Sequence, residues 1–204
     1  MKNKLRIQVI VDMLYDFIDG TLACEHAKEA VTNTVNYLNN LNNLGAYSTA
    51  LYVCDNHPKN HCSFKENGGE WPAHCVKGTH GAEISNKFKK VEIVSPNKYN
   101  IFYKGISPDK EEYSGFNAKR IDGVSIERVI GAIEASVFSN LSTLKDSSIE
   151  ISGIATEFCI KNTALDFLNA GHNVSIIKDN LGWVNKENHE KTLQELSKLG
   201  IKII

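Results

Sequence analysis

Three residues of complementary chemistry each stand after a run of apolar residues: Asp12, Lys104 and, beyond a short turn, Cys159. A carboxylate can accept the proton of a thiol, and an ammonium group can stabilise the resulting thiolate. If the three side chains meet, they can therefore activate a cysteine nucleophile without a histidine. The spacing of these residues fits a second hypothesis equally well: Asp12 caps a loop, and Lys104 is a charged residue exposed to solvent.

Cys159 stands at the start of a predicted helix, directly after the turn Gly153–Glu157. A helix N-terminus stabilises a thiolate, so we expect the pKa of this thiol to be lowered. Backbone N–H groups of the same turn can bind an oxyanion formed by attack on a carbonyl. The position at a helix start does not by itself establish a catalytic role, so the alternative that Cys159 only packs in the core stays open.

The long segment after the second predicted strand lacks regular periodicity and is rich in histidine. Its Asp55, His57 and distant His74 are typical of a divalent transition-metal site with open positions. A closed zinc site on the His-Cys pairs at 61–62 and 74–75 is an alternative, although adjacent ligands reach one metal with difficulty. We expect the metal on Asp55, His57 and His74; a polar loop with unrelated histidines is the remaining alternative.

Three aromatic residues lie in otherwise polar loops: Phe17, Trp71 and Tyr113. Aromatic side chains can sandwich a flat ring, and each stacked pair contributes ~0.5 to 1.5 kcal/mol beyond area burial. Single aromatic residues usually serve packing, so ring binding is expected here only if the wider hypothesis of a catalytic site holds.

The elements that must position these residues are strands alternating with helices. Apolar, β-branched runs predict strands at 5–11, 46–53, 100–103, 147–154, 173–178 and 201–204. Helical spacing and end signals predict helices at 27–44 before the stop at Gly45, at 126–144, from Glu157 to Gly171, and from the cap Asn185 to Gly200.

This alternation predicts an α/β fold: a doubly wound, mostly parallel sheet of about six strands with helices on both faces. In such sheets, ligands bind outside the carboxyl ends of the strands, near the point where the strand order reverses. Asp12, Asp55, Lys104 and Cys159 all follow strands, so we expect them to gather at one edge of the sheet.

Composition predicts a single domain over residues 1–204, because the chain has 204 residues of which 42% are hydrophobic. The formal net charge of −1 argues against nucleic-acid and membrane-surface partners. No apolar run reaches the ~18 to 20 residues of a spanning helix, and residues 1–6 do not resemble a signal peptide. Five cysteines without a Cys-x-x-Cys pair predict free thiols in a cytoplasmic protein, with Cys24 and Cys54 in the core.

Four motifs together resemble a known family: VDMLYDF at 11–17, DNHPKNHCSFKENGGEWPAHCVKGTHGAE at 55–83, PDKEEYSGF at 108–116, and GIATEFCIKNTALDFLNAG at 153–171. The chain resembles the isochorismatase-like cysteine hydrolases, and among them the nicotinamidases (pyrazinamidases). The resemblance spans nearly the whole chain in the correct order. Its most specific parts are the D-x-H…W-P-x-H-C segment and the G-[IV]-A-T-[DE]-x-C turn.

The resemblance implies a role for each candidate residue. It implies a triad of Asp12, Lys104 and Cys159, and one divalent ion, first of all zinc but also manganese or iron, on Asp55, His57 and His74. It further implies an oxyanion hole from the backbone N–H groups of Ala155 and Cys159, a cis peptide bond between Ile154 and Ala155, and substrate contacts from Phe17, Trp71 and Tyr113.

The implied activity is hydrolysis of nicotinamide to nicotinate and ammonia through a cysteine thioester, in NAD salvage, with pyrazinamide as a second substrate. The implied partner is therefore a small molecule. Two alternatives stay open: a related amidase acting on another small amide, and a zinc-stabilised binding protein without turnover.

Three features depart from the family pattern or match no part of it. Leu14 and Tyr15 replace residues that are commonly Gln and Asn, which puts the substrate range in doubt. His61 stands where some members have a fourth metal ligand, while others complete the shell with water. The segment at about 117–146 is longer than usual, and two roles stay open for it: contact between copies in a homo-oligomer, or a cover for the site.

Overall fold

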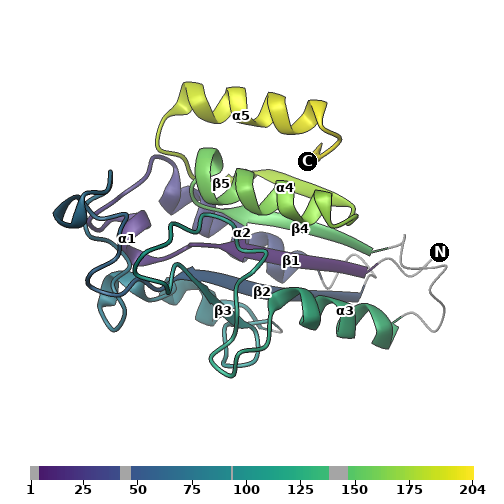
Figure 1. The fold of residues 1–204 in the computed structure, drawn as a ribbon. Coiled ribbons are helices and arrows are strands. Elements are labelled where there is room, and N and C mark those ends of the chain that lie inside the picture. The colour runs from purple at the N-terminus through teal and green to yellow at the C-terminus, as the bar shows by residue number, and fades with distance from the viewer. Residues whose placement is uncertain (1–4, 42–46, 93, 138–146) are drawn as a thin grey trace.

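The computed structural model describes residues 5–41, 47–92, 94–137 and 147–204 (Figure 1). The strands are β1 (Leu5–Val11), β2 (Tyr47–Asp55), β3 (Ile101–Lys104), β4 (Ser147–Gly153), β5 (Val174–Leu181) and β6 (Lys202–Ile203). The α-helices are α1 (Tyr15–Ile18), α2 (Ala27–Asn40), α3 (Ile126–Val137), α4 (Lys161–Asn169) and α5 (Lys186–Lys198). Between β2 and β3 the described chain forms loops and short 3-10 helices, as the missing periodicity predicts.

The strands form one parallel sheet in the order β3-β2-β1-β4-β5-β6. Val11, the last residue of β1, pairs with Val53 of β2 and with Gly153 of β4. The strand order reverses between β1 and β4, so the ends of these two strands flank the crevice where doubly wound folds bind ligands. The predicted α/β fold is confirmed.

Both faces of the sheet are covered, which explains why β1 is an almost continuous apolar run. Leu5, Ile7 and Val9 belong to a core on one face that includes side chains of α3, α4 and α5. Ile10 points to the other face and packs in a second core with α2. Figure 1 shows α3 and α4 in front of the strands and α2 behind them.

Several elements differ from the sequence-based expectation. Helix α1 was not expected, and β2 ends at Asp55 instead of Val53. Strand β5 continues to Leu181 instead of ending at Lys178. Lys178 and Asp179 are exposed, but the two residues after them are buried again, and Leu181 pairs with Gly153 of β4. The helix expected after Glu157 begins with a five-residue π-helical turn, Thr156–Ile160, which leads into α4.

The longer segment at 117–146 is described up to Val137. Its first part pairs with β3 through a bridge between Tyr103 and Lys119, and α3 then places Ile126 and Ile130 in the core. The expected stop at Gly45 and the expected helix beyond Val137 lie outside the described residues.

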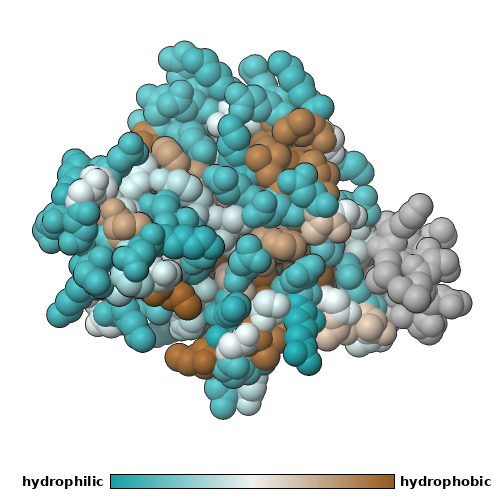
Figure 2. Space-filling view, viewed as in Figure 1, coloured by the Kyte–Doolittle hydropathy of each residue, from teal (hydrophilic) through white to brown (hydrophobic). Residues whose placement is uncertain are grey.

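The helices and the visible surface can be set against what a membrane-crossing segment requires. Within the described ranges, no helix combines the length and the apolar character needed to cross a bilayer. The face seen in Figure 2 is mainly hydrophilic, and its hydrophobic residues form separate groups.

Candidate active site

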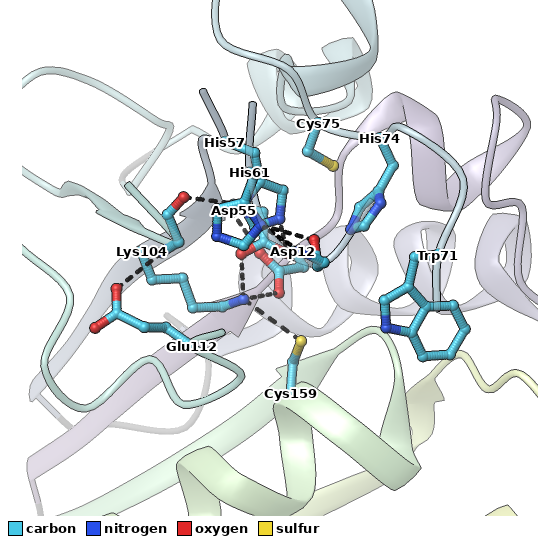
Figure 3. A network of polar contacts seen from close by, with 12 residues as sticks. Asp12, Asp55, His57, His61, Trp71, His74, Cys75, Lys104, Glu112 and Cys159 are labelled. Atoms are coloured by element: carbon cyan, nitrogen blue, oxygen red, sulfur yellow. Dashed lines mark hydrogen bonds and ion pairs between the residues drawn. The ribbon is translucent and has the colours of Figure 1, made fainter. Parts of the chain in front are cut away.

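The carboxyl ends of β1, β2 and β3 bring three charged residues together (Figure 3). Asp12 directly follows β1, while Asp55 and Lys104 are the last residues of β2 and β3 and pair in register. Asp12 has a left-handed backbone (φ 53°), which is uncommon for a residue other than glycine. Its N–H donates to the Val53 carbonyl at 2.9 Å, and its Oδ1 accepts the Asp55 N–H at 2.8 Å, so both strand ends hold it.

The Lys104 ammonium is the centre of the cluster. Its Nζ lies 2.5 Å from Asp55 Oδ1, 2.9 Å from Asp12 Oδ2 and 3.4 Å from Cys159 Sγ. All four residues are buried, with at most 5% of any of them exposed. The structure thus brings Asp12, Lys104 and Cys159 into contact across three strands, while their catalytic roles remain predictions.

Burial and charge set the protonation of this cluster. Burial and the charge of Asp55 raise the pKa of Asp12 to about 6, against the opposing effect of Lys104. Burial would also raise the pKa of Asp55, but Lys104 and His57 outweigh it and hold that pKa below its usual range. Burial would lower the pKa of Lys104, but the two carboxylates raise it well above its ordinary value. Lys104 therefore stays an ammonium at neutral pH.

Cys159 lies in the π-helical turn, and burial raises the pKa of its thiol well above the ordinary value although Lys104 acts in the opposite direction. The expectation of a lowered pKa is therefore wrong, because removal from water disfavours the thiolate more than the local charges favour it. A carboxylate oxygen of Asp12 lies within 4.8 Å of Sγ. The protonated thiol thus has a proton acceptor close by.

The turn before Cys159 has a constrained backbone. The peptide bond between Ile154 and Ala155 is cis, as the resemblance implies. Gly153 has φ 146°, and a Cβ there would lie 2.1 Å from the Val11 carbonyl oxygen, so only glycine fits. Ala155 and Cys159 both line the cavity described below, which is compatible with their predicted use as N–H donors.

Asp55, His57 and His74 form a group whose ligand atoms all lie within 4.8 Å of one another. Nδ1 of His57 lies 2.9 Å from the Gly105 carbonyl oxygen, and Nδ1 of His74 lies 2.8 Å from the Pro72 carbonyl oxygen. A carbonyl only accepts, so each Nδ1 carries the proton and each Nε2 is left as a ligand atom. One carboxylate and two imidazoles that bind through Nε2 fit zinc, manganese or iron.

His61 is buried beside this group, but both of its ring nitrogens have protein partners. Nδ1 lies 2.7 Å from Ser63 Oγ, and Nε2 lies 3.1 Å from the Lys110 carbonyl oxygen. The structure therefore does not present His61 as a fourth ligand. Within the described chain, the groups able to hold a metal include neither Cys62 nor Cys75, which argues against the closed zinc alternative.

The backbone on both sides of His74 is held by residues that sequence reasoning missed. Asp16 is buried, and its Oδ2 accepts the Cys75 N–H at 2.7 Å while its Oδ1 accepts the Thr21 N–H at 3.2 Å. The Thr21 hydroxyl donates to the Ala73 carbonyl at 2.8 Å. An acidic residue between the aromatic residues Tyr15 and Phe17 is the signal that points to such a buried anchor.

A cavity of about 30 Å³ adjoins Cys159 and the predicted metal ligands Asp55 and His74. All three aromatic residues expected to bind a ring line it: Phe17, Trp71 and Tyr113. Trp71 Nε1 donates to the Tyr113 hydroxyl at 3.2 Å, which closes the aromatic wall. Space of this size holds one or two water molecules. A ring can therefore enter only if these side chains move apart.

The cavity wall contains five further side chains to which the sequence analysis gave no functional role: Leu22, Cys24, Glu111, Phe158 and Val184. The Phe158 ring packs 5.1 Å from that of Trp71 and 5.5 Å from that of Tyr113. Cys24 is only partly buried and packs against the edge of the second core, and burial raises the pKa of its thiol to about 12. Glu111 and Phe158 lie within two of the motifs, whereas Leu22, Cys24 and Val184 lie outside all four, so the motifs offer no signal for these three.

The two departures after Asp12 serve packing. Leu14 is buried and forms a bridge with Ile84. Tyr15 stacks on His80 at 4.0 Å, and its hydroxyl accepts the Asn86 N–H at 3.0 Å. Neither residue is part of the cavity wall.

Comparisons with known proteins show which family and which solved structures the chain is similar to. The family model described as the isochorismatase domain matches residues 6–204. The chain is 27% identical over 201 residues to a nicotinamidase of Escherichia coli (strain K12), covering 88% of this chain and 84% of that protein. It resembles the crystal structure of a pyrazinamidase of Pyrococcus horikoshii in complex with zinc, with 32% identity, a TM-score of 0.75 and 98% of each chain covered. PnC1 from L. infantum, solved in complex with nicotinate, is 25% identical with a TM-score of 0.75, over 98% of this chain and 92% of that one.

Proposed function

The chain belongs to the isochorismatase domain family, and from that premise we propose that it is a metal-dependent nicotinamidase. It hydrolyses nicotinamide to nicotinate and ammonia through a thioester on Cys159, as a step of NAD salvage, and it also accepts pyrazinamide. The observation that carries this proposal is the contact of Lys104 with both Asp12 and Cys159 beside the Asp55, His57 and His74 group. The E. coli relative and the two solved neighbours support the choice of substrate.

Asp12 is the general base and acid of the proposed reaction. It takes the proton of the Cys159 thiol as the sulfur attacks the carboxamide carbon, and the nearby Lys104 ammonium stabilises the developing thiolate. The N–H groups of Ala155 and Cys159 donate to the oxyanion. Asp12 then returns the proton to the amide nitrogen, so that the carbon–nitrogen bond breaks and ammonia leaves.

Water completes the cycle by attacking the thioester carbon. Asp12 accepts one proton of this water and passes it to the Cys159 sulfur as the carbon–sulfur bond breaks, and the carboxylic acid that forms loses its other proton to solvent and leaves as nicotinate. The raised pKa of the resting thiol explains why a base is needed, because the thiol is protonated before substrate binds.

Asp55, His57 and His74 would hold the divalent ion at the wall of the cavity. When bound, the ion supplies a Lewis acid that can hold the ring nitrogen of the substrate and so orient the carboxamide toward the thiol. Phe17, Trp71 and Tyr113 then stack on the ring. All five cysteines of the chain are free, which supports a reducing compartment such as the cytoplasm.

Ammonia release from nicotinamide by the purified protein, with and without added zinc, manganese or iron, tests the proposal. We expect metal-dependent release, and we expect Cys159→Ala to lower kcat at least about 10³-fold because the nucleophile is lost. Cys62→Ala is the matched control, and it should retain both activity and bound metal.

Three outcomes would contradict parts of the proposal. Substantial ammonia release by Cys159→Ala would exclude the covalent scheme, and unchanged activity after verified metal removal would exclude the role of the ion. Turnover of other small amides in preference to nicotinamide would favour the related-amidase alternative.

A further inference from the structure

A buried histidine on α5 contacts the turn that precedes the proposed nucleophile. His189 is only 2% exposed, and its Nδ1 lies 2.9 Å from the hydroxyl oxygen of Thr156. Thr156 directly follows Ala155, one of the two proposed N–H donors. His189 lies outside the triad, the metal group and the cavity wall, so nothing derived above explains why a polar ring is buried there.

Thr156 joins the turn to the end of β5. Its N–H and its hydroxyl both donate to the Gly182 carbonyl oxygen, each at 3.0 Å. Because the hydroxyl proton is used in this way, the oxygen is left to accept the Nδ1–H of His189. Buried Thr156 thus has its donor and its acceptor capacity satisfied by two different elements.

The first turn of α5 and the loop before it also contact the turn at Thr156 and Glu157. The carboxylate of Glu157 accepts the N–H of Val184 at 3.2 Å and that of Asn185 at 2.7 Å. The His189 ring also packs against the Trp183 ring, with centroids 4.3 Å apart. Helix α5 and the loop before it therefore hold Thr156 and Glu157, two of the three residues between the proposed donors Ala155 and Cys159.

The surroundings of His189 favour a neutral ring. Burial lowers its pKa. Its Nε2 lies 3.9 Å from Glu190 Oε1, which is too far for a hydrogen bond. A neutral ring with one N–H directed at Thr156 is consistent with both observations.

We propose that His189 is a positioning residue for the oxyanion turn: through Thr156 it holds the Ala155 N–H at the place where charge develops on the carboxamide oxygen. This inference rests on the proposed function. Loss of the contact should affect the transition state more than substrate binding, because the ring-binding side chains lie elsewhere. Small displacements of such donors lower rates by up to about 100-fold.

Three variants separate positioning from packing. His189→Leu fills most of the space without a hydrogen bond, and we expect kcat to fall about 10-fold to 100-fold with KM nearly unchanged. His189→Asn places an amide near the position of Nδ1 and should restore most of kcat. His172→Leu replaces another histidine, which packs on Phe167 away from the turn, and should leave kcat unchanged.

Binding of pyridine-3-carbaldehyde provides a readout without turnover. The S–H of Cys159 adds across the aldehyde C=O, forming a carbon–sulfur bond and placing the former carbonyl oxygen against the donors of the turn. With a ¹³C-labelled aldehyde, the adduct is measured directly by NMR. Its dissociation constant should rise about 10-fold or more in His189→Leu, recover in His189→Asn, and match the wild type in His172→Leu.

The outcomes distinguish this inference from the proposed function. If the wild type releases ammonia but His189→Leu matches it in kcat and aldehyde affinity, or if His189→Asn restores neither, the positioning role is overturned. If the wild type hydrolyses no nicotinamide, the proposed function fails, and the aldehyde measurements alone decide the role of His189. Absence of an adduct with the wild type would overturn the inference as well, because no functional oxyanion turn would exist.

Discussion

Lys104 shows how one residue makes a buried charge cluster tolerable. Two carboxylates and one ammonium carry a net charge of −1 in a place with almost no contact with water. Separately, each of these charges would be costly to bury, but each is paired at hydrogen-bonding distance. The remaining negative charge fits a cation held by Asp55, His57 and His74, so charge balance and donor chemistry support the same metal group.

Replacement of Lys104 by methionine should therefore destabilise the protein strongly. Lys104→Met leaves Asp12 and Asp55 facing each other without a cation, and breaking a buried pair in this way costs about 3–5 kcal/mol. Urea unfolding of the metal-free protein measures the loss. The control Lys161→Met removes an exposed pair with Glu195 and should leave the unfolding midpoint almost unchanged. Equal stability of the two variants would show that Lys104 is not the balancing charge.

At the scale of elements, the site depends on how β3 ends. Gly105 follows β3 with φ 61°, and its carbonyl accepts the Nδ1–H of His57. A Cβ at this position would lie 2.3 Å from the His57 ring. Glycine is therefore required both for the left-handed backbone and for the close approach of His57, a predicted metal ligand.

Gly105→Ala should weaken zinc binding at least about tenfold, because the added methyl group displaces His57 and disturbs its hydrogen bond. Gly123→Ala is a matched control, since Gly123 also has positive φ (83°) but a Cβ there meets no atom within 4 Å. Competition with a chromophoric chelator measures both affinities. Both variants carry the strain of a left-handed alanine, so equal zinc affinities would mean that the contact with His57 is unimportant.

At the scale of the whole molecule, the site joins the two halves of the sheet. Asp55 and Lys104 come from β2 and β3 on one side of β1, whereas Cys159 follows β4 on the other side. The unfolded chain cannot assemble this group, so a ligand that needs the assembled site binds the native state. Such binding stabilises the native state by mass action.

Zinc should therefore raise the unfolding temperature. At a free concentration 100 times its dissociation constant, zinc adds about 2.7 kcal/mol, which corresponds to about 5–10 °C for a chain of this length. Thermal unfolding across a zinc titration measures the shift, and His74→Ala should abolish it. A shift that persists in His74→Ala would place the metal elsewhere.

The sequence alone determined the alternation of elements, the parallel sheet and the strand ends that carry Asp12, Asp55 and Lys104. These follow from periodicity and from residue types at neighbouring positions, which act locally along the chain. The Asp-x-His spacing and the thiol after a Gly-containing turn likewise indicated a metal group and a nucleophile.

Only the tertiary structure decided what depends on burial and on distant partners. The raised pKa of the Cys159 thiol, the use of both His61 nitrogens, and the place of Phe158 in the cavity wall each depend on segments far apart in the sequence. The contact of His189 with Thr156 spans 33 positions and has no local signal. Desolvation and packing are properties of the assembled sheet and its helices, so the order of residues along the chain does not reveal them.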